Sequence, residues 1–435
     1  WLGQRRVGLL SSRGSTNGLV DGMPCLSRVR ACICFFRRSR IEEGDEENPS
    51  MSMVRSCSGR NPNVYALRRR FSELQRSNDL VVVLKGRERF KDYFRETETV
   101  GEGGFGKVSR GTFTRKGVAS LPGLEARRTY VVKRIARLSR DAEMEEIQRS
   151  CMQLTSERHI DFLRWINSEQ CSDNYFLRVF GEFVQGGADP CLYVALENLE
   201  GPDMLDWLAQ LDGTVPEYQA AELIRQMLMA LQYLHRMAGA LHRDVKYENF
   251  GFTRMVLAGQ PLPPLRLFDL GLCWVLEEPV TEDTASVMYD LSPCGTAVWM
   301  APETWQGRIG PPSDTWAVGV ALHDMLTFTW AFNLLACRGD DNSAIAAAVI
   351  TGRLDLATDD WRTISPSARD LVANLLEKDP AKRATTEQAL EHPWLGSAGE
   401  RTPGSRPRNR AEMARTERQQ SVYWSSLASM AHGAR

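Results

Sequence analysis

The stretch LHRDVKYENFGF, residues 241–252, places an acid, a lysine and an amide close together just before a strand-like run. In such a loop Asp244 can accept the proton of an attacking hydroxyl, Lys246 can neutralise a phosphoryl group in transfer, and Asn249 can hold a magnesium ion. The alternative, a polar loop that only faces solvent, explains the spacing of Asp244, Lys246 and Asn249 less well. The residues therefore predict phosphoryl-transfer chemistry.

A further carboxylate follows in LRLFDLG, residues 265–271, where an apolar strand-like run ends in Asp269. Mg²⁺ prefers oxygen ligands and is usually held by one or two carboxylates together with substrate phosphates. Asp269 is therefore a candidate for the second metal ligand.

Three glycines in GEGGFGKV, residues 101–108, form a GxGxxG pattern after a strand-like run. Residues without a Cβ atom let backbone N–H groups approach phosphate oxygens. A second strand-like run follows in place of the helix that a dinucleotide fold requires, which favours a hairpin lying over a nucleotide. Lys133 stands in the next β-rich run, TYVVKRI. A lysine at the end of an apolar strand usually extends its ammonium group into solvent. Because Lys133 follows the glycine-rich loop in the next strand, its charge can instead pair with the α- and β-phosphates of a nucleotide.

The elements that must position these residues follow from changes in composition along the 435-residue chain. Residues 1–92 are rich in Ser, Gly and Arg and predict a disordered, basic extension. From 93 onward strand-like runs predict a small β-rich part, and after about residue 220 apolar residues recur at helical spacing. Residues 396–435 predict a second disordered, basic tail. The folded unit, 93–395, is expected to be α+β.

Charge is distributed unevenly along the chain. Its net charge is −1, but residues 1–92 carry +8, residues 396–435 carry +4 and residues 93–395 carry −13. A protein that binds nucleic acid needs Lys and Arg on the binding surface, whereas residues 93–395 are acidic. We therefore expect no nucleic-acid partner and expect basic substrates instead.

The longest strictly apolar run, 344–350, is far shorter than the roughly 20 residues that span a membrane. No secretory signal or zinc-finger cysteine spacing is recognisable, which favours a reducing compartment, the cytoplasm, with the nucleus left open.

With these motifs the sequence resembles the eukaryotic protein kinase family, and the resemblance extends over residues 93–395. Further motifs occur in the family's order: CGTAVWMAPE at 294–303, SDTWAVGV at 313–320 and DPAKRATTEQALEHPWL at 379–395. The resemblance implies a two-lobed fold, with a β-rich N-lobe at about 93–198 that carries one main helix and a helical C-lobe at about 199–395. Residues 350–380 resemble the calcium/calmodulin-dependent group in particular.

The resemblance also implies a site for ATP and Mg²⁺. Lys133, Asp244 and Lys246 would be the catalytic residues, and Asn249 and Asp269 the metal ligands. The nucleotide would contact the glycine-rich loop, the strand that carries the lysine and the hinge between the lobes: Val100, Gly101, Glu102, Gly103, Gly104, Phe105, Gly106, Val108, Val131, Lys133, Glu197, Leu199 and Asp203.

Four positions depart from the family pattern. Val131 replaces the alanine expected above adenine, and Gly251 replaces the large apolar residue expected beneath it. We predict that a bulkier ceiling over a thinner floor keeps the pocket volume similar. Leu270 replaces the phenylalanine of the DFG motif, and Trp299 replaces the tyrosine before the APE motif. The lysine, the catalytic aspartate and the metal ligands are intact.

The family pairs its strand lysine with a glutamate on a helix of the small lobe. Glu145, Glu146 and Glu157 are the candidates here. We favour Glu157, because Leu154 and Ile160 flank it at three-residue spacing on one helical face.

The resemblance assigns structural and regulatory roles as well. Glu303 is expected to pair with a buried Arg383, and Asp314 to anchor the catalytic loop. Arg243 stands where the family binds a phosphorylated residue of the activation segment, and Ser292 matches that residue, so an upstream kinase is an expected partner. The fallback phosphorylation sites are Thr281, Thr284 and Ser286.

Lys246 and Thr296 match the serine/threonine kinases rather than the tyrosine kinases. We therefore predict a protein serine/threonine kinase. Asp203 and Glu248 fall where related kinases read an arginine upstream of the target hydroxyl, which predicts protein substrates with Arg or Lys near that hydroxyl; the alternative is two acids that merely face solvent. The rival functions are a nucleotide-binding pseudokinase scaffold, opposed by the intact Lys133, and phosphorylation of a small molecule.

The tails carry weaker signals. No EF-hand loop occurs in the sequence, so direct calcium sensing is not expected. The composition of residues 413–430 is compatible with calmodulin binding, and Cys32 and Cys34 lie beside a basic patch that suits palmitoylation and membrane association. For both segments the plainer alternative, an unmodified basic tail, is favoured.

Overall fold

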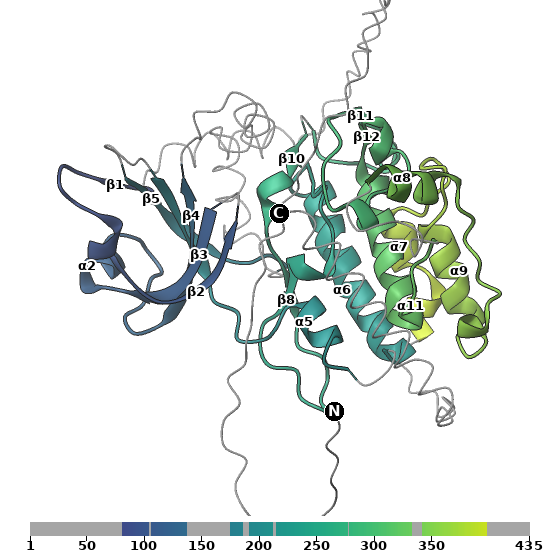
Figure 1. Ribbon diagram of the computed structural model, residues 1–435, viewed down its shortest axis with the longest axis horizontal. Helices are drawn as coiled ribbons and strands as arrows, with labels where there is room; N and C mark the ends of the chain where they lie inside the picture. The colour runs from purple at the N-terminus through teal and green to yellow at the C-terminus, as the bar shows by residue number, and fades with distance from the viewer. Residues whose placement is uncertain are drawn as a thin grey trace, which may run out of the picture.

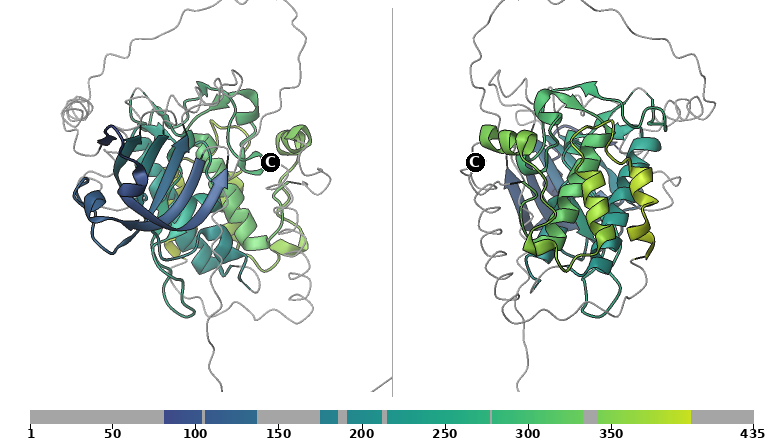
Figure 2. Two further views of the ribbon diagram at one scale, coloured as in Figure 1. Left: turned by 60° about the vertical axis from the view of Figure 1, so that its left-hand side comes forward. Right: turned by 90° about the vertical axis from the view of Figure 1, so that its right-hand side faces the viewer.

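A computed structural model describes residues 81–103, 106–136, 175–185, 191–211, 215–276, 278–332 and 342–397. Residues 1–80 and 398–435, which include Cys32, Cys34 and residues 413–430, lie outside these described residues, as do all three candidate glutamates for Lys133. Two parts stand side by side, a twisted sheet and a larger group of helices (Figure 1). The rotated views in Figure 2 show the same separation.

The small lobe is built on a sheet that has six strands within the described residues, in the order β1-β5-β6-β4-β3-β2. The strands are β1 (Val81–Leu84), β2 (Phe94–Gly103), β3 (Gly106–Phe113), β4 (Thr129–Ala136), β5 (Val179–Gln185) and β6 (Cys191–Glu197). β1 runs parallel to β5, and the other neighbours pair antiparallel. A one-turn helix, α2 (Arg115–Val118), follows β3.

Alternation along β4 sorts its side chains between two environments. Tyr130 and Val132 are 0% and 2% exposed in a core of aromatic rings, whereas Val131 and Lys133 point to the opposite face, toward the large lobe. The core rings come from most strands and from the turn before β2: Phe90, Tyr93, Phe94, Phe113, Tyr130, Phe180 and Phe183. This packing fixes the face on which the lysine stands.

The folded unit begins before Tyr93, the boundary that the sequence suggested. β1 pairs with β5, and Phe90 in the 3-10 turn η2 (Phe90–Asp92) is buried and stacks on Tyr193 at a centroid distance of 3.9 Å. Residues 81–92 are therefore part of the small lobe, because their apolar side chains complete its core. Our assignment of these residues to a disordered extension was wrong.

Helices dominate the large lobe. They are α5 (Met204–Leu208), α6 (Glu217–Arg236), α7 (Pro311–Thr327), α8 (Asn342–Thr351), α9 (Pro366–Leu375), α10 (Thr386–Leu390) and α11 (Pro393–Ser397). On α6 the residues at helical spacing, Leu223, Met227, Leu231 and Leu234, are all 0% exposed, as the periodicity predicted. Every residue of α7 is buried, which makes it the central helix of the lobe. None of the described helices is long and apolar enough to cross a membrane.

Short strands between the helical and sheet parts carry the candidate site. They are β7 (Ala240–Leu241), β8 (Phe250–Phe252), β9 (Leu265–Leu267), β10 (Trp274–Val275), β11 (Tyr289–Asp290) and β12 (Arg308–Ile309). β7 pairs with β10, β8 with β9, and β11 with β12, all antiparallel. The loops that leave β7 and β9 contain Asp244 and Asp269. The mixed α and β architecture predicted from the sequence is confirmed.

Candidate active site

Lys133 reaches across from the small lobe to the large one. Its Nζ lies 2.8 Å from Oδ1 of Asp269, which comes two positions after the end of β9. The charge of Lys133 and the hydrogen bond that it donates lower the pKa of Asp269 to about 2. Asp269 takes the left-handed backbone conformation, with φ of 53°, which is uncommon for a residue with a side chain. This turn directs its carboxylate toward the lysine and away from the core of the large lobe.

Asp244 lies at the centre of a second network. Its Oδ1 accepts hydrogen bonds from the backbone N–H and the hydroxyl of Thr296, at 2.9 and 2.8 Å. Lys246 Nζ lies 2.8 Å from Asp244 Oδ2 and donates to the Thr296 hydroxyl at 2.8 Å. Both carboxylate oxygens are thus held by donors, so the side chain has a fixed orientation. Lys246 is only 2% exposed, and its charge is compensated by Asp244.

Asn249 connects the two acids. Its side-chain nitrogen donates to the Asp244 carbonyl at 2.7 Å, and its backbone carbonyl accepts from Phe268 N at 2.9 Å, next to Asp269. Because the amide nitrogen is used in this way, the amide oxygen remains to face a cation. One amide oxygen and one carboxylate, completed by phosphate oxygens, are a donor set that suits Mg²⁺. The described residues contain no cluster of three or more His, Cys, Asp or Glu that could hold a metal.

Asp314, in the first turn of α7, supports the catalytic loop from below. Its two oxygens accept from the backbone N–H groups of His242 and Arg243, at 2.8 and 2.9 Å, and from His235 Nε2 at 2.8 Å. Burial alone would raise the pKa of Asp314, but the hydrogen bond and charge of His235 outweigh it and lower that pKa. This buried anion fixes the backbone just before Asp244.

Arg243 lies beside Ser292, the residue that the sequence suggested as its phosphorylated partner. Its guanidinium donates to the Ser292 carbonyl at 2.9 Å, and its backbone has a positive φ of 70°. The structure thus brings the arginine and the activation segment together through the main chain.

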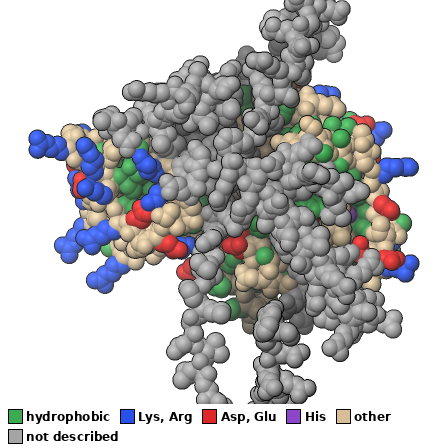
Figure 3. All heavy atoms as spheres, in the orientation of Figure 1, with side chains coloured by type: hydrophobic (Ala, Val, Ile, Leu, Met, Phe, Trp, Pro, Cys, Tyr) green, Lys and Arg blue, Asp and Glu red, His purple; other side chains and the backbone are tan. Residues whose placement is uncertain are grey.

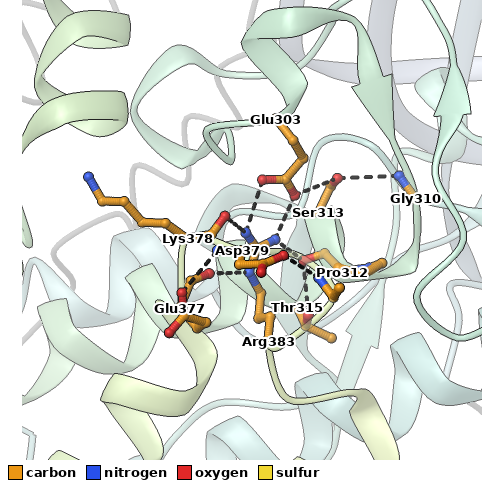
Figure 4. Close-up of polar contacts among 10 residues, drawn as sticks. Glu303, Gly310, Pro312, Ser313, Thr315, Glu377, Lys378, Asp379 and Arg383 are labelled. Atoms are coloured by element: carbon orange, nitrogen blue, oxygen red, sulfur yellow. Dashed lines mark hydrogen bonds and ion pairs between the residues drawn. The ribbon is translucent and has the colours of Figure 1, made fainter.

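Figure 4 shows the pair formed by Glu303 and Arg383 beneath the activation segment. Two hydrogen bonds of 2.6 and 2.9 Å join the guanidinium to the two oxygens of the carboxylate. Arg383 also donates to the carbonyls of Pro312 and Glu377, and Ser313 donates to Glu303. The side chains are 0% and 6% exposed, so the pair is fully desolvated.

The positions that we expect to face adenine lie where β4 and the expected hinge meet the large lobe. Val131 pairs with Leu196 across the antiparallel strands β4 and β6, so both side chains share one face with Lys133. Asp203 caps α5 by accepting from Asp206 N at 2.7 Å. Burial, and then the charges of Asp206 and Glu248, raise the pKa of Asp203 to about 7, although the hydrogen bond from Asp206 opposes the shift.

From Gly251 we predicted a thinner floor beneath the expected adenine position. The structure shows no such thinning at this residue. A Cβ atom at this glycine would lie 2.6 Å from Leu199 Cδ1 and 2.9 Å from Phe268 Cε1. Two neighbouring side chains therefore already fill the space that a larger residue would take. Sequence reasoning missed Phe268, although a large aromatic residue directly before Asp269 was the available signal.

Sequence reasoning also missed Tyr247. Its ring packs edge-to-face on Trp299 at 4.8 Å, and its hydroxyl donates to the Ala321 carbonyl on α7 at 2.7 Å. The tyrosine thus joins the catalytic loop to the segment before the APE motif and to the central helix. Within the glycine-rich loop, Gly104 and Phe105 lie outside the described residues, while Gly103 and Gly106 pair in the β2–β3 hairpin.

Comparison with known proteins agrees with this geometry. The model of the protein kinase domain family matches residues 94–395. Calcium-dependent protein kinase 29 of Arabidopsis thaliana is 34% identical over 204 residues, 47% of this chain and 35% of that protein. Calcium-dependent protein kinase 22 of Oryza sativa subsp. japonica is 29% identical over 314 residues, 71% of this chain and 47% of that protein. The chain therefore spans less than half the length of these relatives. Because the family model matches more than half of the chain, this chain is a member of the protein kinase family.

Proposed function

We propose that this chain is an active protein serine/threonine kinase that transfers the γ-phosphoryl group of Mg-ATP to protein substrates with basic residues near the target hydroxyl. The observation that carries the proposal is the orientation of Asp244 by Thr296 and Lys246, beside the Lys133–Asp269 pair. A scaffold that only bound nucleotide would have no need of this network around Asp244.

Transfer would proceed in one displacement. Asp244 accepts the proton of the substrate hydroxyl, whose oxygen forms a bond to the γ-phosphorus while the bond to the β,γ-bridging oxygen breaks and ADP leaves. Lys246 stands where it can neutralise the moving group, and Lys133 where it can hold the α- and β-phosphates. Asn249 and Asp269 would hold Mg²⁺, which would neutralise charge on the phosphates.

The basic-substrate preference is supported by acids around Asp203. The charges of Asp206 and Glu248 act on Asp203, so the three carboxylates form one negative region at the hinge side of the large lobe. In the view of Figure 3, Lys and Arg side chains are exposed on the small lobe and at the opposite end of the large lobe. The three acids and the negative balance of residues 93–395 suit a cationic peptide.

The remaining assignments accompany this proposal. We assign residues 81–395 to the kinase domain and both tails to flanking, basic segments. Cys191, Cys273 and Cys294 are free thiols, which is consistent with the cytoplasm as the compartment. An upstream kinase acting on Ser292 is the proposed regulator.

One experiment tests the activity. The full chain is incubated with labelled ATP, Mg²⁺ and an arrayed peptide library, beside the Asp244→Asn variant. We expect label on Ser or Thr peptides that carry Arg or Lys, and none with the variant. Equal label in both samples would identify a contaminant, and nucleotide binding without any label transfer would favour the pseudokinase.

A further inference from the structure

On the side of the large lobe that faces the small lobe, Gly251 has no side chain and the ring of Phe268 lies against it. Phe250 and Phe252, on either side of Gly251 in β8, are both 0% exposed in the core of the large lobe. Because side chains alternate along a strand, any side chain at residue 251 would point the other way, toward the small lobe. The space above Gly251 is therefore the floor of the proposed adenine site.

Phe268 points into the same space. Leu267, the last residue of β9, is 0% exposed in the core, so the next side chain along the extended chain turns away from it. The Phe268 backbone N–H donates to the Asn249 carbonyl at 2.9 Å, which holds the ring beside β8. One edge of that ring lies over Gly251, with Cε1 2.9 Å and Cδ1 3.8 Å from where a Cβ would stand.

Leu199 completes the floor from the hinge. Its Cδ1 atom is 2.6 Å from the same Cβ position. Opposite these side chains stands Val131, on the face of β4 that also presents Lys133. The site therefore has an aliphatic ceiling and a floor that combines an aromatic ring with a leucine.

We infer that Phe268 replaces the missing side chain of residue 251 as the floor on which the adenine base rests, and that Gly251 is required to make room for it. Phe268 is thus a specificity-determining residue for the base, one position before the acid that serves the phosphates. The inference rests on the proposed function, because it presumes that nucleotide binds between Val131 and this floor.

The consequence is a division between base and phosphate recognition. Removing the ring takes away apolar surface from beneath adenine but leaves Lys133 and the carboxylate of Asp269 in place. Contact between a base and an aromatic ring typically contributes an amount that corresponds to about a tenfold change in affinity. Binding of a triphosphate without a base should not change.

The test measures dissociation constants of the full chain with Mg²⁺ for ATP and for inorganic tripolyphosphate, in wild type, Phe268→Ala, Gly251→Leu and the double variant. We expect Phe268→Ala to weaken ATP binding about tenfold and to leave tripolyphosphate binding unchanged. Gly251→Leu should also weaken ATP binding, because the leucine collides with the ring and with Leu199. The double variant should recover ATP affinity to within about threefold of wild type, because one apolar side chain again fills the floor.

Gly396→Leu is the matched control, because a Cβ at Gly396 meets no atom within 4 Å. Its affinities should equal those of wild type. Thermal unfolding of each variant checks the fold, and Phe268→Leu, which keeps most of the apolar volume, replaces Phe268→Ala if the latter does not fold.

The outcomes separate the two levels of the argument. If wild type binds tripolyphosphate or transfers phosphate, and Phe268→Ala leaves ATP affinity unchanged, the proposed role of Phe268 beneath adenine is wrong. The kinase proposal then stands. Equal losses for ATP and tripolyphosphate, or no recovery in the double variant, would also overturn the role of Phe268. Failure of wild type to bind ATP would overturn both that role and the kinase proposal.

Discussion

Thr296 donates both its backbone N–H and its hydroxyl to one oxygen of Asp244, and its hydroxyl in turn accepts from Lys246. The threonine thereby closes a ring of three side chains from two segments about 50 residues apart. The activation segment and the catalytic loop are held in one arrangement, and a change on either side is transmitted to the acid that receives the proton.

Replacing Thr296 with alanine should lower kcat by about tenfold to a hundredfold, because Asp244 and Lys246 lose their shared hydroxyl and the acid loses its fixed orientation. The Michaelis constant for ATP should change little. Steady-state kinetics on a basic peptide measure both. Thr296→Ser retains the hydroxyl and should keep most of the activity; an alanine variant with wild-type kcat would contradict the orienting role.

Replacing Lys133 with methionine should reduce kcat/KM for ATP by at least about a hundredfold, since the ammonium that faces the phosphates is lost. The pKa of Asp269 should rise, because the charge of Lys133 is the largest cause of its depression. Lys116→Met removes a lysine that pairs with Glu88 on the far side of the small lobe and serves as the control. Similar losses in the two variants would point to damage of the lobe rather than of the site.

The preference for basic peptides should increase with pH. Asp203, with a pKa of about 7, is mostly protonated and neutral at pH 6 and mostly negative at pH 8. The ratio of kcat/KM for an arginine-containing peptide to that for a neutral one should therefore rise by up to about tenfold between these values. In Asp203→Asn the ratio should stay flat. If the wild-type ratio falls as the pH rises, ionisation of Asp203 does not increase the preference for basic peptides.

Breaking the Glu303–Arg383 pair should destabilise the large lobe severely. Arg383→Met leaves the Glu303 carboxylate buried without its cation and should cost about 3–5 kcal/mol of unfolding free energy in urea titrations. Replacing both residues with apolar side chains should cost less than the single change. Arg362→Met, which removes an exposed pair with Asp359, should stay within about 0.5 kcal/mol of wild type.

Local patterns were sufficient for much of the architecture. The helical spacing of Leu223 and Leu231 predicted the buried face of α6, because one amphipathic face is a property of a single segment. The glycine pattern and Lys133 likewise predicted a hairpin followed by a lysine-bearing strand. The resemblance to the kinase family then predicted which residues meet, as with Glu303 and Arg383.

Contacts between distant segments were harder to predict. The run at 81–84 is short and lacks alternation, and it becomes a strand only because β5 offers it an edge. The packing of Tyr247 on Trp299 and of Phe268 over Gly251 depends on how neighbouring strands and loops are spaced in three dimensions. The aromatic residue before Asp269 was a signal for the second contact, but a linear pattern does not show what its ring packs against. Our prediction of a thinner floor at Gly251 did not foresee these neighbours for the same reason.

The parallel pairing of β1 with β5 puts β1 at one border of the sheet, while β2, which leads into the glycine hairpin, forms the opposite border. Whatever is attached ahead of Val81 thus joins the molecule at the margin remote from the nucleotide entrance.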